Sequence, residues 1–271
     1  MMNKALTIAG SDSGGGAGIQ ADLKTFQELE VFGMSAITAV TAQNTLGVHG
    51  VYPMTAEAVD QQIQAIGKDM GTDAVKTGML FNAEIIEVVA GNLKKFGWGN
   101  VVVDPVMIAK GGASLLLQEA IAAMKTYLLP LAKVITPNIP EAEVLTGMKI
   151  QTPDDKREAA KRLFDLGVNN VVIKGGHEEN PTQSIDLLFD GQEFYCFTNK
   201  RIHTKNTHGT GCTFSAAIAA ELAKGSSVYE AIKVAKEFIQ DAIQDGIEIG
   251  LGHGPTNHGA YRKRKMERVK S

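Results

Sequence analysis

Short apolar runs alternate with segments of helical periodicity along this chain, and this alternation limits its fold more than any other feature. The runs are ALTIAG at 5–10, SAITAVTAQ at 35–43, AVKTGML at 74–80, VVVDPVM at 101–107, VITPN at 134–138 and VVIKGG at 171–176. Most of them lack a polar residue at every second position, which is typical of strands buried on both faces of a sheet. A helix after each strand indicates a mainly parallel sheet covered by helices on both sides.

Helix signals occupy the stretches between these runs. Residues 18–29 repeat apolar side chains at the three- and four-residue spacing of an amphipathic helix. Thr55 is suited to cap a helix that extends to about Met70, and Thr152 precedes a proline at the first helical position. Ser227 stands three residues before Glu230, as in a capping box. Strand and helix are therefore expected to alternate along most of the chain.

Residues 186–197 depart from this plan. Asp190-Gly191 separates two apolar runs there, which predicts a β-hairpin and hence antiparallel strands at one edge of the sheet. No low-complexity linker or internal repeat interrupts the 271 residues, so we expect a single domain over 1–271. The last eleven residues, 261–271, are basic and are expected to form a frayed, solvated tail.

Composition excludes several classes of protein. Hydrophobic residues make up 44% of the chain and charged residues 21%, which allows a large core and argues against global disorder. The net charge of −3 argues against a nucleic-acid partner or an anionic membrane. The two cysteines form no disulfide framework, and we find neither a signal peptide nor an apolar run of transmembrane length. We therefore expect a cytoplasmic protein.

The segment THGTGCTFSAA at 207–217 combines a glycine-rich turn with the start of a helix. Such a turn offers backbone N–H groups and the positive end of the helix dipole to an anion. The same field is expected to draw the thiol of Cys212 toward the thiolate. An anion cradle beside a base suits phosphoryl transfer, because positioning and charge neutralisation provide most of that catalysis.

Polar residues stand where several predicted strands end. In open α/β sheets, ligands bind outside the carboxyl ends of the strands. Two carboxylates and an amide there can hold Mg²⁺ through water, and a lysine can pair with phosphate. The polar residues at these strand ends are Asp12, Gln43, Asp104, Asn138 with Glu141, and Lys174. Together with the glycine turn, they provide the components of a metal-dependent kinase.

Motifs of other enzyme classes fail. GSDSGGGAGIQAD fits neither G-x-G-x-x-G nor a Walker A loop, which needs a lysine. HEEN at 177–180 lacks the second histidine of a zinc protease, and G-x-S-x-G is absent. A nicotinamide-dependent dehydrogenase, a P-loop ATPase, a metalloprotease and an α/β-hydrolase are therefore disfavoured.

Seven ordered motifs resemble those of one known family. They are GSDSGGGAGIQADLKTF, TAQNT, KTGML, VVVDPVM, ITPNIPEAE, KGGH and NTHGTGCTFSAA. The chain resembles the hydroxymethylpyrimidine/phosphomethylpyrimidine kinases of thiamine biosynthesis, in the ribokinase superfamily. The resemblance implies a three-layer α/β/α fold with antiparallel edge strands, ATP and Mg²⁺. It also implies two successive phosphorylations of 4-amino-5-hydroxymethyl-2-methylpyrimidine, and a homodimer as is common in the family.

The resemblance also assigns roles to residues. Cys212 takes the place of the base, where many sugar kinases of the superfamily have aspartate. The other implied residues are an anion hole of Gly209, Thr210 and Gly211; a pyrimidine site of Asp22, Gln43 and Met79; Mg²⁺-associated Asp104 and Glu141, the latter through water; and nucleotide or phosphate contacts from Asn138, Lys174 and Lys110. His208 is expected to shape the loop rather than to act as the base. Gly14 stands where the family usually has serine, and we leave it out of the site.

Each role has a structural alternative. Cys212 could simply pack at a helix start, Asn138 and Glu141 could cap a helix, and Asp22 or Lys110 could be solvated. Among functions, a pyridoxine/pyridoxal kinase is the closest rival, alone or as a side activity, because pyridoxal also carries a hydroxymethyl group on an aromatic ring. A non-catalytic binding protein is disfavoured because the candidate base, carboxylates and lysine are all present.

Overall fold

The computed structural model describes residues 2–107, 118–176 and 182–270, of which Gln118 and 268–270 are described by backbone alone. These residues form a nine-stranded sheet with the strand order β3-β2-β1-β4-β5-β6-β7-β8-β9. The strands are β1 (Lys4–Asp12), β2 (Phe32–Asn44), β3 (Gly47–Pro53), β4 (Ala74–Thr77), β5 (Val101–Val103), β6 (Val134–Ile135), β7 (Val171–Ile173), β8 (Gln183–Phe189) and β9 (Phe194–Lys200).

The sheet is mainly parallel. β2, β1, β4, β5, β6 and β7 run in the same direction, and their registers pair Leu6 with Met34 and with Val75. β8 and β9 are antiparallel at one edge, which confirms the hairpin predicted around Asp190-Gly191. The hairpin of β2 and β3 at the other edge is a finding beyond the sequence prediction, because β3 mixes glycines with apolar residues and has no clear alternation.

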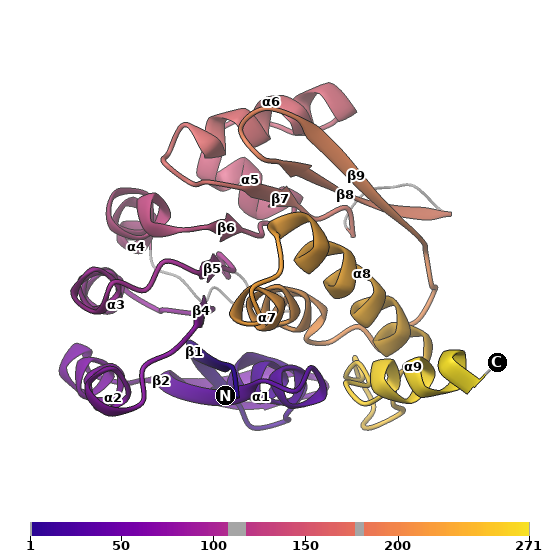
Figure 1. The fold of residues 1–271 in the computed structure, drawn as a ribbon, viewed down its shortest axis with the longest axis horizontal. Helices are drawn as coiled ribbons and strands as arrows, with labels where there is room; N and C mark the ends of the chain where they lie inside the picture. The colour runs from indigo at the N-terminus through magenta and orange to yellow at the C-terminus, as the bar shows by residue number, and fades with distance from the viewer. Residues whose placement is uncertain (1, 108–117, 177–181, 271) are drawn as a thin grey trace.

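Helices cover both faces of the sheet, as Figure 1 shows for α2, α3 and α4 on one side of the strands and α7 and α8 on the other. The helices are α1 (Gly18–Glu28), α2 (Ala56–Asp69), α3 (Ala83–Phe96), α4 (Gln118–Ala123) with the short turns Met124–Leu128 and Leu129–Leu131, α5 (Ile139–Thr146), α6 (Pro153–Phe164), α7 (Thr210–Ala223), α8 (Val228–Gln244) and α9 (Ala260–Lys270). The predicted caps Thr55, Thr152 and Ser227 each accept a backbone N–H three residues on. The three layers are confirmed.

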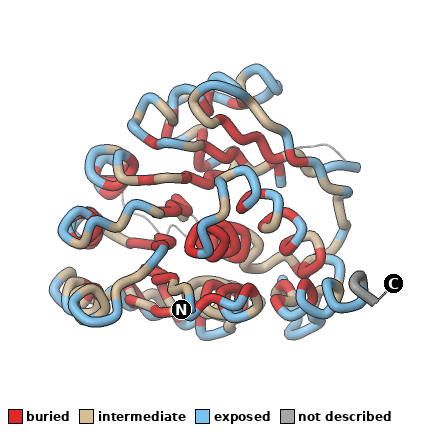
Figure 2. Tube along the Cα trace, in the orientation of Figure 1, coloured by how far each residue is buried: buried red, intermediate tan, exposed pale blue. Residues whose placement is uncertain are grey.

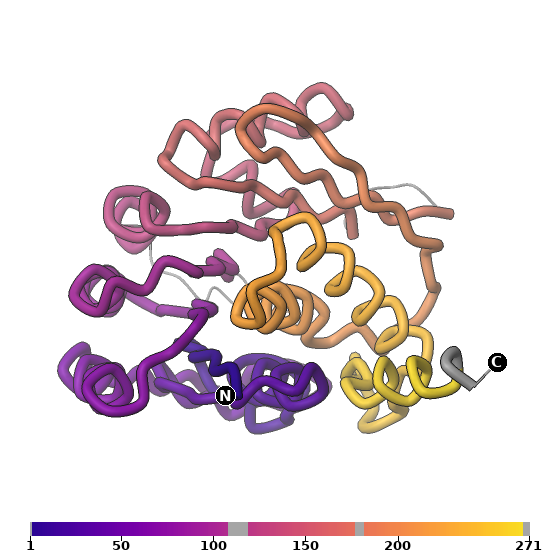
Figure 3. The backbone as a smooth tube through the Cα atoms, in the orientation of Figure 1, coloured from indigo at the N-terminus to yellow at the C-terminus, as the bar shows by residue number. Residues whose placement is uncertain are grey.

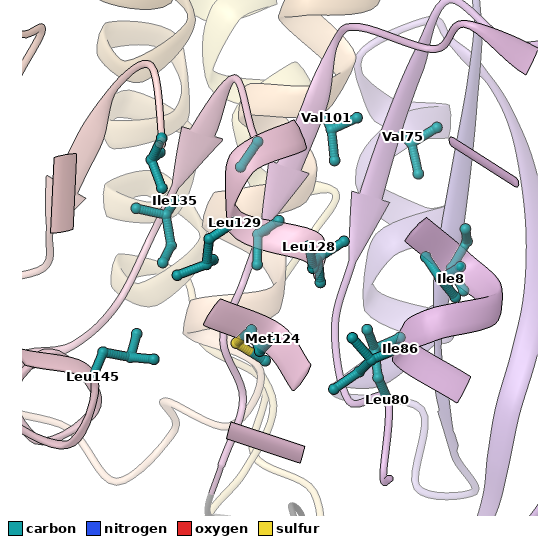
Figure 4. Close-up of a cluster of buried hydrophobic side chains, with 14 of the residues drawn as sticks. Ile8, Val75, Leu80, Ile86, Val101, Met124, Leu128, Leu129, Ile135 and Leu145 are labelled. Atoms are coloured by element: carbon teal, nitrogen blue, oxygen red, sulfur yellow. The ribbon is translucent and has the colours of Figure 1, made fainter. Parts of the chain in front are cut away.

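Alternate residues of the same strand enter two separate cores. Leu6 and Ile8 of β1 face the core under α2–α6, which Figure 4 shows with Val75, Val101 and Met124. Ala5 belongs to the core under α1, α7 and α8. Both faces of the central parallel strands are therefore buried, which explains the continuous apolar runs in the sequence.

Helix α7 lies in the middle of its layer. It packs against α1, α8 and the strands β1, β4 and β5. Every residue from Thr213 to Ala223 is buried, as Figure 2 shows for the red helix at the centre of the view. Small side chains let this helix approach the sheet closely, and its N-terminus consequently reaches the carboxyl ends of the central strands.

The C-terminal tail was expected to be frayed, but it forms a helix. Residues 260–270 form helix α9, and the Tyr261 ring packs against Phe238 of α8 with centroids 5.2 Å apart. Arg264 Nε donates to Asp245 Oδ2 at 3.0 Å. The basic residues therefore lie on a docked helix, because the buried side chain of Tyr261 anchors it. Figure 3 shows this last helix, in yellow, at the end of the backbone trace. Among the described residues, no helix is long and apolar enough to cross a membrane.

Candidate active site

A cavity of about 660 Å³ opens at the carboxyl ends of the parallel strands. It brings together residues that lie far apart in the sequence, as expected for strand ends that converge at one edge of a sheet. The predicted site residues that line it are Asp12, Gln43, Met79, Asp104, Asn138, Glu141, Lys174, Gly209, Thr210, Gly211 and Cys212. Asp22 does not line this cavity, and Lys110 lies outside the described residues.

The turn before α7 has the form of an anion site. Gly209 is the N-cap with φ +80°, and a Cβ there would lie 1.7 Å from the Gly16 carbonyl oxygen. Only glycine fits this backbone conformation and this close approach. The N–H groups of the first helical turn lack intrahelical acceptors. The Thr210 N–H donates to the Thr207 carbonyl at 3.4 Å, which leaves those of Gly211 and Cys212 for a ligand in the cavity. The geometry supports the predicted anion hole.

The expected activation of Cys212 is wrong for the unliganded chain. Burial raises the pKa of its thiol to about 11, and the carboxylates Asp22 and Asp104 act in the same direction. The Lys76 ammonium and the Gly18 backbone N–H oppose this rise but do not overcome it. A helix start lowers the pKa of a thiol that is well solvated, whereas Cys212 is partly buried at the wall of the cavity, where desolvation raises its pKa.

Lys174 and Asp104 lie beside the glycine turn. Lys174 Nζ donates to Asp104 Oδ1 at 3.0 Å, and a Cβ at Gly211 would be 3.3 Å from the same Nζ. Burial alone would lower the pKa of Lys174, but the carboxylates Asp104 and Glu141 more than offset it and raise that pKa. The buried lysine thus already has a carboxylate partner, and a phosphate would be a second partner rather than the first.

Glu141 is positioned by a capping box at the start of α5. Asn138 Oδ1 accepts the Glu141 N–H at 2.9 Å, and Glu141 Oε2 accepts the Asn138 N–H at 2.8 Å. The structural alternative for these two residues, a helix cap, is therefore confirmed, and the same cap places both of them at the cavity. Burial raises the pKa of Glu141 to about 7, against the opposing effect of Lys174 and with Asp104 adding to the rise.

The carboxylates fit a divalent cation only in part. Asp104 and Glu141 are buried oxygen donors in one cavity, which suits Mg²⁺. Among the described residues, however, no group of three or more His, Cys, Asp or Glu side chains converges as a metal cage. The donor set suits a cation that keeps water and takes phosphate oxygens as its other ligands.

The predicted pyrimidine residues separate into two groups. Gln43 and Met79 line the cavity, and the Met79 carbonyl accepts the Thr38 hydroxyl at 2.6 Å. Asp22 is completely buried on α1, where its Oδ2 accepts from Lys76 Nζ at 2.9 Å and from the Thr7 hydroxyl at 2.6 Å. Asp22 therefore acts on the cavity only through Lys76, which does line it.

Lys76 is a site residue that the sequence analysis missed. It is fully buried, and although burial alone would lower its pKa, the adjacent Asp22 carboxylate raises that pKa well above its usual value. Cys212 and Asp104 add to this rise, which places a positive charge near the thiol. A lysine in the middle of the apolar strand AVKT was the signal, because a buried lysine needs a partner.

Asp12 and His208 join the glycine-rich loop after β1 to the turn before α7. Asp12 Oδ2 lies 2.8 Å from His208 Nε2 and accepts the N–H groups of Gly16 and Ala17 at 3.0 and 2.8 Å. His208 also exchanges backbone hydrogen bonds with Gly254 and Thr256. These contacts support the expectation that His208 shapes the loop.

The opposite half of the cavity is formed by β8, β9 and α8. Lys236 Nζ donates to Asp186 Oδ2 at 2.7 Å, and Asp186 Oδ1 accepts the Gly175 N–H at 2.7 Å. Both side chains of this ion pair are less than a tenth exposed. The pair fastens the edge hairpin to the helix and rigidifies this end of the cavity.

Fold and site together define a class of protein, the small-molecule kinases with a ribokinase-like α/β fold. A solved structure of Bacillus subtilis pyridoxal kinase, an ADP complex, is similar over 97% of this chain and 99% of that chain, with a TM-score of 0.90 and 48% identity. A family model described as phosphomethylpyrimidine kinase matches residues 12–257, and the chain belongs to this family.

Two curated relatives from Bacillus subtilis (strain 168) match almost the full chain. A hydroxymethylpyrimidine/phosphomethylpyrimidine kinase is 59% identical over 263 residues, which are 97% of this chain and 97% of the relative. A pyridoxine kinase is 49% identical over 264 residues, which are 96% of this chain and 97% of the relative. The chain is a phosphotransferase, and its relatives include kinases named for two different acceptors.

Proposed function

We propose that this protein transfers the γ-phosphoryl group of ATP to 4-amino-5-hydroxymethyl-2-methylpyrimidine and then to the resulting monophosphate, in thiamine biosynthesis. The observation that carries the proposal is the position of the glycine turn at 209–212, between an acceptor wall with Gln43 and a charged wall with Lys174. The kinase that is 59% identical to this chain supports the pyrimidine as acceptor.

Each wall has a part in the proposed reaction. Backbone N–H groups of Gly209, Thr210 and Gly211 hold the γ-phosphate, and Lys174 neutralises its charge. Gln43 pairs with the aminopyrimidine edge and Met79 contacts the ring, with Asp22 acting behind Lys76. Mg²⁺, when bound through water near Asp104 and Glu141, supplies further positive charge to the phosphate oxygens. The cap residue Asn138 holds Glu141 in place, and Lys110 is proposed as a phosphate contact from the resemblance alone.

Cys212 is the proposed base. The oxygen of the hydroxymethyl group attacks the γ-phosphorus, the bond to the ADP oxygen breaks, and the alcohol proton passes to the thiolate. Because burial raises the pKa of Cys212 to about 11, the reactive thiolate is scarce at neutral pH and its fraction grows as pH rises. The second acceptor is a phosphate monoester, which is already anionic and needs little help from a base.

Cys212→Ala tests this assignment. We expect the variant to lose at least about a hundredfold in the first phosphorylation, the usual contribution of a general base, and much less in the second. The first step of the wild type should also accelerate between about pH 7 and pH 9, and this slope should disappear in the variant. Equal losses in both steps would contradict the role of Cys212 as a base.

Products analysed by mass spectrometry test the proposed substrates. Purified protein is incubated with Mg-ATP and, separately, with hydroxymethylpyrimidine or pyridoxal. We expect pyrimidine monophosphate to form first and diphosphate to follow. A reaction without added Mg²⁺ and with a chelator serves as the control for the cation. Pyridoxal phosphate in the absence of pyrimidine diphosphate would overturn the acceptor while leaving the kinase class intact.

A pyridoxine or pyridoxal kinase activity is the second candidate. It is favoured by the pyridoxine kinase that is 49% identical and by the pyridoxal kinase structure with a TM-score of 0.90. We propose it as a side activity, measurable as the ratio of kcat/KM for the two acceptors. We further propose that the protein works in the cytoplasm as a homodimer whose partners are small molecules rather than nucleic acid or membrane.

A further inference from the structure

Four side chains in contact form one row along the acceptor wall. Asp12 Oδ2 lies 2.8 Å from His208 Nε2, which lies 3.3 Å from Gln43 Nε2. The other end of the same amide, Gln43 Oε1, lies 3.2 Å from Thr41 Oγ1. All four residues line the cavity. Strand β2 has a bulge between Ala42 and Gln43, and such a bulge changes the direction in which the following side chain points.

The Asp12 end of the row determines where the His208 proton lies. Burial disfavours the charge of Asp12, but hydrogen bonds from His208 and from the backbone of Ala17 and Gly14 lower the pKa of the carboxyl. An ionised carboxylate only accepts hydrogen bonds, so His208 Nε2 must carry a hydrogen. This holds for the neutral and for the charged imidazole alike. His208 Nε2 therefore cannot accept a hydrogen bond from an NH₂ group of Gln43.

The Thr41 end of the row leads to the same conclusion. The Thr41 hydroxyl has one hydrogen, and it donates to the Ser11 carbonyl at 2.8 Å. Toward Gln43, the Thr41 hydroxyl oxygen can therefore only accept. If the Gln43 oxygen lay there, two acceptor oxygens would face each other at 3.2 Å without a hydrogen between them. Rotation of the amide by half a turn replaces both unfavourable contacts with hydrogen bonds, and the two ends of an amide have the same shape.

We propose that Asp12, His208 and Thr41 fix the side-chain amide of Gln43 with its oxygen toward His208 and its nitrogen toward Thr41. His208 Nε2–H is then shared between Asp12 and the Gln43 oxygen, and one Gln43 N–H donates to the Thr41 oxygen. His208 is thus a positioning residue for the acceptor site, and its effect on the acceptor passes through Gln43.

This polarity sets which edge of an acceptor can pair with Gln43. The consequence rests on the proposed function: an aminopyrimidine edge offers an N–H donor next to a ring nitrogen acceptor. The amide pairs with that edge in one orientation only, with the amino group on the His208 side and the ring nitrogen on the Thr41 side. A pyridoxal ring has no amino group beside its ring nitrogen, so the fixed amide favours the pyrimidine.

NMR of the free protein tests the amide directly, without reference to activity. We expect nuclear Overhauser contacts from the Gln43 side-chain NH₂ to the Thr41 methyl group rather than to the His208 ring. The imidazole ¹⁵N shifts should show a protonated Nε2. Contacts from the NH₂ group to the His208 ring, or an unprotonated Nε2, would overturn the proposal even if the protein phosphorylated the pyrimidine as proposed.

Two variants at one position test the effect on selectivity. His208→Leu removes the donor, whereas His208→Gln keeps an N–H donor at similar reach. We expect His208→Leu to lower the ratio of kcat/KM for hydroxymethylpyrimidine over pyridoxal about tenfold, mainly through KM, and His208→Gln to retain the ratio. Equal ratios in both variants would overturn the proposal. A wild type that fails to phosphorylate the pyrimidine would instead reject the proposed function, and the NMR result would still stand.

Discussion

Among single residues, Cys212 shows how burial can outweigh a helix N-terminus. Because its pKa is raised to about 11, almost all of it is thiol at neutral pH. In a Cys196→Ser background, we expect iodoacetamide to alkylate Cys212 slowly near pH 7, with a rate that rises about tenfold per pH unit, because the thiolate is the nucleophile. Peptide mass spectrometry measures this rate. A rate that is constant between about pH 6 and pH 8 would show a lowered pKa instead.

His258 should make stability depend on pH. Burial lowers the pKa of its imidazole from 6.5 to about 4, with the nearby positive charge of Lys24 acting in the same direction. The unfolded chain therefore binds a proton between these values while the folded chain does not. Stability is complete above pH 6.5 and falls as pH decreases toward 4, by on the order of 3 kcal/mol from this group.

Denaturant unfolding at several pH values checks the contribution of His258. We expect His258→Gln to lose most of the slope between about pH 4 and pH 6.5, since glutamine does not titrate there and can still meet the Thr213 hydroxyl that lies 3.0 Å from His258 Nε2. His49→Gln, a change at an exposed histidine, is the matched control. An unchanged slope in His258→Gln would assign the pH dependence to other groups.

Among elements, the Lys236–Asp186 pair joins α8 to the edge hairpin. Lys236→Met leaves the buried Asp186 carboxylate without its cation, and we expect a loss of about 3–5 kcal/mol in the free energy of unfolding. Adding Asp186→Asn removes the buried charge and should recover most of that loss. Urea unfolding measures both variants, and Lys233→Met on the exposed side of α8 is the control. A single-variant loss below about 1 kcal/mol would refute the importance of this pair.

Across the whole molecule, the β2–β3 edge offers exposed apolar side chains to the proposed homodimer. Leu46 and Tyr52 on this hairpin are 65% and 64% exposed, and Leu251 on the adjacent loop is 88% exposed. An edge strand also offers unpaired backbone groups to a second chain. We expect Leu46→Asp with Tyr52→Lys to weaken dimerisation at least tenfold in analytical ultracentrifugation, whereas Tyr127→Lys leaves it unchanged. A wild type that is monomeric at high concentration would contradict the homodimer.

The sequence was sufficient to predict the parallel strands, the β8–β9 hairpin and which polar residues gather at one cavity, because these follow from local pattern; the β2–β3 hairpin was not predicted. Buried apolar runs predicted the parallel strands, and the polar residue after each run marked a common edge. Asp104, Glu141 and Lys174 therefore meet at one cavity as expected. Contacts between distant segments were not predictable in the same way. From the sequence, Asp22 could be a solvated charge on α1, whereas in the structure it is buried in an ion pair with Lys76 of β4.

The effects of tertiary packing on the pKa of a side chain and on the order of a terminal segment also could not be predicted from the sequence. The thiol of Cys212 looked activated because the helix start is visible in the sequence, whereas its burial is not. The tail at 261–271 was expected to be frayed because four of the five residues 261–265 are basic, but the remaining one, Tyr261, docks on Phe238 and the segment forms a helix. In each case, a tertiary contact reversed the conclusion drawn from local chemistry.

The glycine turn at 209–212, the proposed anion site, is braced by a segment made late in protein synthesis. The His208 N–H donates to the Gly254 carbonyl at 3.0 Å, and the Thr256 N–H donates to the His208 carbonyl at 3.2 Å. Translation at about 5–20 residues per second separates the turn from its brace by seconds. A nascent chain that has exposed Cys212 thus still lacks the support of its phosphate site. The proposed site is therefore complete only after residues 254–256 have been synthesised and have folded back onto the turn.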